Sequence, residues 1–153
     1  MRDMPQQVSP ELFLEMGRKA LASQPFSMLL GAQLQALSRG AVEIALPLED
    51  KHRQQNGFAH GGVVSYLADN ALTFAGGTAL AVPVVTAEFK INYVRPATGE
   101  RLVAYARAVH VGRTQAVCTC EIHAIGADGE DKVCAIAQGT IVPLAAGGAA
   151  AQA

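Results

Sequence analysis

Asp69 is the residue whose type and surroundings point most clearly to chemistry. It lies in segment 60–80, where apolar residues recur at helical spacing. No other Asp, Glu, Lys or Arg occurs between Arg53 and Glu88. A solvated helix face usually carries several charges, so this lone carboxylate predicts a surface that faces a ligand or another subunit. At about 100° per residue, the same side of the helix holds small and hydroxyl-bearing residues, namely Gly62, Ser65, Tyr66, Thr73 and Gly76.

The same helix begins at His60-Gly61-Gly62, nine positions before the carboxylate. Glycine is a poor helix former, so two glycines here indicate that another group approaches the backbone closely. The first N–H groups of a helix have no partner within it, and they can stabilise a developing oxyanion. The alternative is an ordinary turn into a helix with an incidental histidine.

The elements that must hold these residues follow from hydrophobic periodicity. Ser9-Pro10-Glu11 is typical of a helix start, and that helix should end near Ser23. Consecutive strands joined by short turns must be largely antiparallel, and one long helix can cover one face of their sheet. We therefore predict an α+β hotdog fold: a six-stranded antiparallel sheet wrapped around one long central helix, with an additional N-terminal helix. Alternation or flanking turns predict strands at 31–37, 41–46, 86–93, 102–111, 115–127 and 133–142.

Composition excludes several classes of function. The 153 residues are half hydrophobic and 16% charged, which predicts one packed domain rather than a disordered chain. A net charge of −1 gives no electrostatic footprint for nucleic acid or a membrane surface, so we expect neither as a partner. Three cysteines without a CxxC pair argue against a disulfide framework or a metal site, and no targeting segment is visible. We expect a cytoplasmic protein with an N-terminal helix and lead-in over 1–30, a hotdog domain over 31–144 and a flexible tail over 145–153.

Three stretches resemble one known family, the PaaI-type hotdog acyl-CoA thioesterases. His60-Gly61-Gly62 followed by Leu67-Ala68-Asp69-Asn70-Ala71 is similar to the family signature. The run 86–97, with Tyr93-Val94-Arg95-Pro96-Ala97, is similar to the strand and turn that follow the helix. Val111-Gly112-Arg113-Thr114 resembles a later hairpin. The resemblance covers roughly 31–144 and implies hydrolysis of acyl-CoA thioesters.

The resemblance also implies roles for residues around the helix start. The acid at the position of Asp69 is the nucleophile or the general base towards water. The amide of Gly61 polarises the thioester carbonyl, with Gly62 beside it in the substrate site, and His60 orients the loop or contacts the thioester. Six residues before that histidine the family has an amide side chain, which here is Gln54.

Four further residues are candidates by the same resemblance. Asn56 lies close enough to Gln54 to compete for the amide role. Thr73, one turn after the acid, matches a hydroxyl that holds water in some members, and Thr86 matches another such hydroxyl in others. The residue that positions the water therefore stays open. Arg113 matches a basic position that can reach the CoA phosphates.

Helix geometry adds an argument that is independent of the resemblance. Nine residues separate His60 from Asp69 by about 13.5 Å and half a turn, so they cannot meet around one carbonyl within a single helix. If both act on one thioester, they come from different chains of a symmetric dimer. We expect a homodimer with its active sites at the interface, itself arranged as a dimer of dimers.

The leading hypothesis is hydrolysis of an acyl-CoA thioester to a carboxylic acid and CoA, without metal or other cofactor. One alternative is a hotdog dehydratase or hydratase, which needs an acid–base pair around an alkene. The other is a non-catalytic regulator that binds acyl-CoA, although no DNA-binding segment is attached. There is no G-x-S-x-G elbow for a serine hydrolase, and the acyl group stays open.

Overall fold

The computed structural model describes residues 8–145, so nearly all of the expected flexible tail lies outside the described residues. These residues fold into three helices, a short 3-10 turn and six strands. In chain order they are α1 (Pro10–Ala22), α2 (Pro25–Leu30), β1 (Gln33–Ser38), β2 (Ala41–Pro47), the 3-10 turn η1 (Asp50–His52), α3 (Gly61–Leu80), β3 (Val84–Tyr93), β4 (Arg101–Val111), β5 (Ala116–Ile125) and β6 (Asp131–Pro143).

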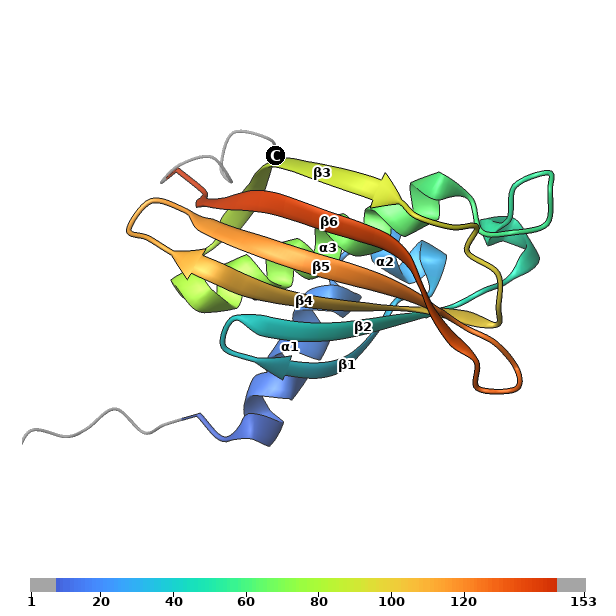
Figure 1. Cartoon of the computed structure of the whole chain (residues 1–153). Helices are drawn as coiled ribbons and strands as arrows, with labels where there is room; N and C mark the ends of the chain where they lie inside the picture. Colours follow the sequence, from blue (N-terminus) through green and yellow to red (C-terminus); the bar gives the residue numbers. More distant parts are fainter. Residues whose placement is uncertain (1–7, 146–153) are drawn as a thin grey trace, which may run out of the picture.

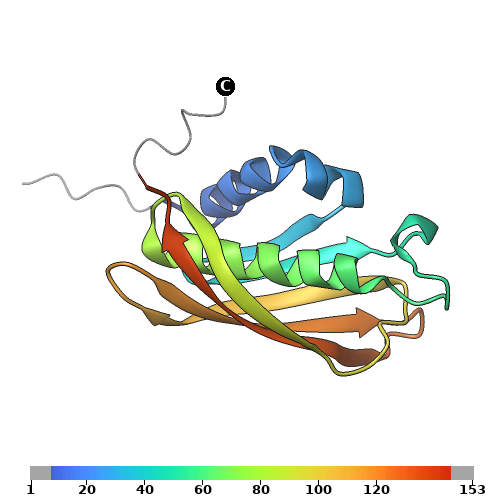
Figure 2. The same ribbon diagram turned by 90° about the horizontal axis from the view of Figure 1, so that it is seen from above.

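The six strands form one antiparallel sheet in the order β1-β2-β4-β5-β6-β3. The sheet curves around α3, which runs along its concave face, and α1 and α2 lie beyond the β1 end (Figures 1 and 2). The predicted hotdog fold with an additional N-terminal helix is confirmed. No helix in the described part of the chain is both long and apolar enough to cross a membrane.

The core lies between α3 and the inward face of the sheet. Leu67, Ala71 and Leu72 of α3 are fully buried, as are Leu102 of β4 and Ile122 of β5. Burying each of these leucine and isoleucine side chains contributes about 1.5–3 kcal/mol, so the sheet and the helix stabilise one another. The helix that carries Asp69 is therefore held rigidly.

The three cysteines belong to this core rather than to a reactive site. Cys118, Cys120 and Cys134 are free thiols, each at most 2% exposed. Burial raises the pKa of Cys118 to about 11 and that of Cys120 to about 12. The thiols therefore stay protonated at neutral pH and do not act as nucleophiles.

Helix α2 is an element that the sequence reasoning missed. The strand expected from residue 31 begins instead at Gln33, because Gly31 ends α2 in the left-handed conformation, with φ of 83°. Pro25 starts the helix at a position where proline needs no N–H partner. Buried Ser27 fastens α2 to α3, since its hydroxyl accepts a hydrogen bond from Tyr66 at 2.6 Å.

Strand β3 is an edge strand with a break in its alternation. Its pairing with β6 shifts register between Thr86 and Glu88, which leaves Ala87 without a ladder partner. Strict alternation would put Thr86 on the outer face with Glu88. The bulge instead turns Thr86 inward, to the side where Phe89 packs against the core.

The two edges of the sheet differ in how they are covered. Helix α1 packs along β1, with Gly17 so close to Leu37 that a Cβ there would lie 2.4 Å from its Cδ2. The free edge of β3 has no strand partner among the described residues (Figure 1). A ten-residue open edge offers a row of backbone groups to a second strand.

Candidate active site

Asp69 lies at the middle of α3 and faces the edge strand β3. The Thr86 hydroxyl donates a hydrogen bond to Oδ1 of Asp69 at 2.7 Å. Thr73, one helical turn after the acid, donates to the Asp69 carbonyl at 2.8 Å and lies 2.9 Å from the Thr86 hydroxyl. The structure thus brings both candidate hydroxyls together around one carboxylate. The second carboxylate oxygen has no hydrogen-bond partner among the described residues and is free to accept a proton.

His60 caps the N-terminus of α3 with its side chain. Its Nδ1 accepts a hydrogen bond from the Gly62 N–H at 2.8 Å, so the ring proton of the neutral imidazole lies on Nε2. A Cβ on Gly62 would lie 3.0 Å from that Nδ1, which explains the glycine. The N–H of Gly61 has no partner among the described residues. Gly61 is therefore the backbone donor that can serve a ligand.

Tyr93, at the end of β3, fixes the start of α3 from the other side. Its hydroxyl donates to the Gly61 carbonyl at 3.1 Å and also contacts the Ser65 hydroxyl. A Cβ on Gly61 would lie 3.5 Å from the Tyr93 ring, an ordinary van der Waals contact. Sequence reasoning gave Tyr93 no role beyond the family resemblance, although its inward position in an alternating strand was a usable signal.

A cavity of about 440 Å³ opens beside the unpartnered N–H. Gln54 lines this cavity together with Gly61, whereas Asn56 does not. The Asn56 N–H instead donates to Oε1 of Gln54, which leaves the Gln54 amide nitrogen available as a donor. The geometry favours Gln54 over Asn56 for the amide role. Other residues around the cavity are Phe58, Ala59, Val64, Tyr93, Val94, Arg95, Pro96, Ala97 and Cys134.

The carboxylate and the free N–H do not meet within one chain. Gly61 and Asp69 are eight residues apart on the continuous helix α3, which is about 12 Å along its axis. Each chain therefore carries two half-sites, a donor with a cavity at the helix start and a carboxylate with two hydroxyls at its middle.

Arg113 lies at the opposite end of the molecule from the cavity. It is exposed in the turn between β4 and β5, beyond the C-terminal end of α3 (Figure 1). The structure thus separates Arg113 from Gly61 and Gln54 of the same chain. Contact with a ligand in that cavity would require an Arg113 from another chain.

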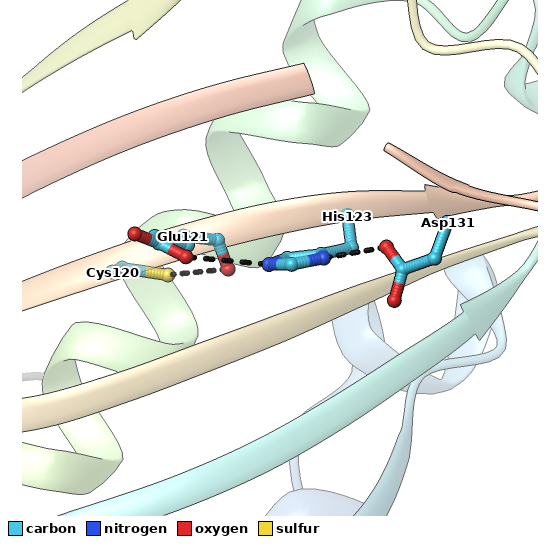
Figure 3. A network of polar contacts seen from close by, with 4 residues as sticks. All are labelled: Cys120, Glu121, His123 and Asp131. Carbon is cyan, nitrogen blue, oxygen red and sulfur yellow. Dashed lines mark hydrogen bonds and ion pairs between the residues drawn. The ribbon is translucent and has the colours of Figure 1, made fainter. Parts of the chain in front are cut away.

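Two features on the outer face of the sheet are distinct from these half-sites. His123 lies between Asp131, at 2.6 Å, and Glu121, at 3.3 Å (Figure 3). No hydroxyl or thiol among the described residues is hydrogen-bonded to this ring, so the cluster is not a catalytic triad. A hollow of about 770 Å³ on the same face is lined by residues such as Tyr105 and touches neither Asp69 nor Gly61.

Sequence reasoning missed two groups of residues that hold α3 in place. Ser27, Tyr66 and Asn70 form a hydrogen-bonded cluster between α2 and the turn of α3 that carries the acid, and burial raises the pKa of Tyr66. His52, at the end of η1, is fully buried. Its carbonyl accepts the His60 N–H at 2.8 Å and so holds the start of α3.

The fold and the two half-sites define a class of protein. The sheet wrapped around α3 is shared with a solved thioesterase family protein. Residues 56–129 match the family model described as "Thioesterase superfamily". The chain belongs to this superfamily, and the resemblance to its PaaI-type members is confirmed.

Solved and curated relatives agree with this assignment. A thioesterase family protein from Silicibacter pomeroyi is 36% identical, with a TM-score of 0.79, over 85% of this chain and 96% of that one. A solved variant of the phenylacetic acid degradation protein PaaI from Thermus thermophilus is 30% identical, with a TM-score of 0.70, over 79% of this chain and all of that one. Acyl-coenzyme A thioesterase 13 of Pongo abelii is 31% identical over 63% of this chain and 71% of its own length.

Proposed function

We propose that the protein hydrolyses acyl-CoA thioesters in active sites that two chains share. The observation that carries this proposal is the pair of half-sites on α3, a free Gly61 N–H at a cavity and an Asp69 carboxylate held by Thr86. Together they supply the two groups that addition of water to a thioester needs, a base for the water and a donor for the oxyanion.

In the proposed mechanism, Asp69 acts as the general base. Thr86 holds Oδ1, and the second carboxylate oxygen takes a proton from water as the water oxygen attacks the thioester carbon. The carbonyl oxygen becomes an oxyanion that accepts the Gly61 N–H, with the Gln54 amide as a second donor. The carbon–sulfur bond then breaks, the thiolate leaves with the proton from Asp69, and a carboxylic acid and CoA result. No metal or other cofactor takes part in these steps.

A direct attack by Asp69 would give an anhydride instead, and isotope labelling distinguishes the two routes. In a single turnover in H₂¹⁸O, attack by Asp69 puts ¹⁸O into its carboxylate if water then opens the anhydride at that side. General-base catalysis leaves Asp69 unlabelled and puts one ¹⁸O into the product acid.

A homodimer that pairs two β3 edges would complete the sites. Strand β3 and helix α3 run antiparallel, so a two-fold axis beside β3 sets the start of one α3 near the later half of the other. The Gly61 cavity of one protomer then faces Asp69 of its partner. The same symmetry carries the partner's Arg113 towards the cavity, where it could reach CoA phosphates. Two such dimers would form the expected tetramer.

Release of free thiol from aryl, short-chain and medium-chain acyl-CoAs tests the activity and also identifies the acyl group. We expect Asp69→Asn to keep the fold and acyl-CoA binding but to lose most turnover. Unchanged turnover by Asp69→Asn would refute the mechanism. Hydration of an enoyl-CoA without thiol release would favour the dehydratase alternative, and binding without any reaction would favour the regulator.

Subunit exchange tests the shared site. Asp69→Asn and Gly61→Pro are each expected to be inactive, but a mixed dimer contains one site with both defects and one with neither. Random exchange at equal amounts makes half of the dimers mixed, so about a quarter of wild-type activity should return. Differently tagged chains report that mixed dimers formed. Mixed dimers without activity would refute the shared-site model.

A further inference from the structure

A second cavity adjoins the Gly61 cavity and has two of the same residues in its wall. The second cavity has a volume of about 310 Å³ and shares Arg95 and Pro96 with the first. It is also lined by Thr98, Ala124, Gly126, Glu130 and Lys132. Arg95 and Pro96 therefore border both cavities, and a ligand path from the candidate oxyanion donor to Lys132 would pass them.

Arg95 is the cation without a partner on this path. Its backbone N–H is bonded to the Cys134 carbonyl, but its guanidinium makes no hydrogen bond or ion pair with any of residues 8–145. Lys132, by contrast, pairs with Glu130 at 2.7 Å. The positive charge of Arg95 also acts on buried Cys134, where it opposes the rise of the thiol's pKa that burial causes. The guanidinium therefore stands close to the cavity wall.

The residues that line the Gly61 cavity offer the kinds of contact that a phosphopantetheine arm needs. Gly61 and Gln54 offer polar donors, and Arg95 offers a cation. The apolar wall includes Val64, Pro96 and Ala97. Tyr93 touches Gly61, and Arg95 follows two residues later in the bend after β3, where it lines the same cavity. A thioester carbonyl at Gly61 thus leaves its pantetheine arm along the apolar wall and its phosphate near the free guanidinium.

We propose that Arg95 binds the phosphate esterified to the pantetheine arm of the thioester, with Lys132 as a weaker second cation. This inference rests on the proposed function, and it assigns the phosphate contact to Arg95 of the same chain that supplies Gly61. Arginine suits the role because its planar guanidinium binds phosphate through two parallel hydrogen bonds. The same phosphate occurs in CoA and in phosphopantetheine on a carrier protein.

Calorimetric binding of three thiols isolates the phosphate contact. Pantetheine lacks the phosphate, 4′-phosphopantetheine carries it, and CoA adds the nucleotide. A hydrogen-bonded charge pair is worth roughly a tenfold change in affinity or more, so phosphopantetheine should bind the wild-type protein at least about tenfold more tightly than pantetheine. Arg95→Ala should reduce that ratio to within about threefold, and Arg95→Lys should retain part of it.

Matched variants make the result specific. Arg107, an arginine exposed on the outer face of the sheet, serves as the control, and Arg107→Ala should keep the wild-type ratio. Lys132→Ala should lower the ratio less than Arg95→Ala does. If CoA loses affinity in Arg95→Ala by the same factor as phosphopantetheine, the contact is to the phosphate that both sources share. A loss confined to CoA would overturn the proposal in favour of a nucleotide contact.

The inference would be overturned if Arg95→Ala left the ratio of phosphopantetheine affinity to pantetheine affinity unchanged. It would also be overturned if Arg113→Ala, and not Arg95→Ala, abolished that ratio. Absence of thiol binding to the wild-type protein would overturn it too. Hydrolysis of acyl-CoA, measured on the same preparations, is judged separately. Phosphate-dependent binding without hydrolysis would reject the proposed function and leave the Arg95 contact standing, whereas hydrolysis with Arg95-independent binding would reject only the contact.

Discussion

Gly61→Pro removes one hydrogen atom that the proposed mechanism needs and little else. Gly61 is the first residue of α3, where proline is common because its missing N–H would have no helical partner. The preceding His60 has φ of −62° and ψ of 136°, an extended conformation that a following proline accepts. A Cβ at this position would make ordinary contact with Tyr93, 3.5 Å away. The variant should therefore fold.

Loss of one oxyanion donor typically lowers kcat by about 10²–10³, or about 2.7–4 kcal/mol in the barrier. We expect a decrease of this size for Gly61→Pro with its best acyl-CoA. Gly61→Ala adds a comparable Cβ but keeps the N–H, so it should stay within a few-fold of wild type. Thiol release gives kcat for all three proteins, and thermal unfolding verifies that they are equally folded. Equal kcat for the proline and alanine variants at equal stability would show that this N–H is not the oxyanion donor.

Three other outcomes are expected. Thr86→Val should lower kcat about tenfold or more in the thiol-release assay, because the carboxylate loses a hydrogen bond, and Thr86→Ser should restore it. Gly76→Ala should cost about 1–3 kcal/mol in urea unfolding, since its Cβ would lie 2.6 Å from that of Ile141, and a stability equal to that of Gly77→Ala would contradict this. The free energy of unfolding should fall between pH about 9.0 and about 12, because unfolded thiols ionise there while Cys120 stays protonated, and replacing the three cysteines should flatten that fall.

Local periodicity was enough to determine most of the fold. Strands such as 102–111 alternate with period two, and segment 60–80 has its apolar residues at helical spacing. The periodicity of each segment therefore predicts whether it forms a strand or a helix. Helical periodicity also identified Asp69 as the lone charge on its helix and placed it half a turn around the helix axis from His60. These properties depend only on residues that are neighbours along the chain, which explains why sequence reasoning reached them.

The details of the site depended on contacts between distant segments. A bulge at Ala87, set by pairing with β6, turns Thr86 towards Asp69, whereas strict alternation would point it away. Helix α2 is only six residues long and is held by Ser27 rather than by its own propensity, so no periodic signal marked it. The bulge and helix α2 both depend on packing between distant segments, which local sequence patterns do not predict.

The choice between similar residues was likewise a matter of tertiary structure. Gln54 and Asn56 have the same chemistry and lie two positions apart, and only the fold of their loop puts Gln54 in the cavity with Gly61. Arg95 and Arg113 are both exposed cations near turns, yet only Arg95 lines the cavity of its own chain. The sequence by itself determined the sheet, the central helix and the isolated acid, because these arise from short-range patterns. The tertiary structure alone decided which side chains share a cavity, because that depends on how segments far apart in the chain pack together.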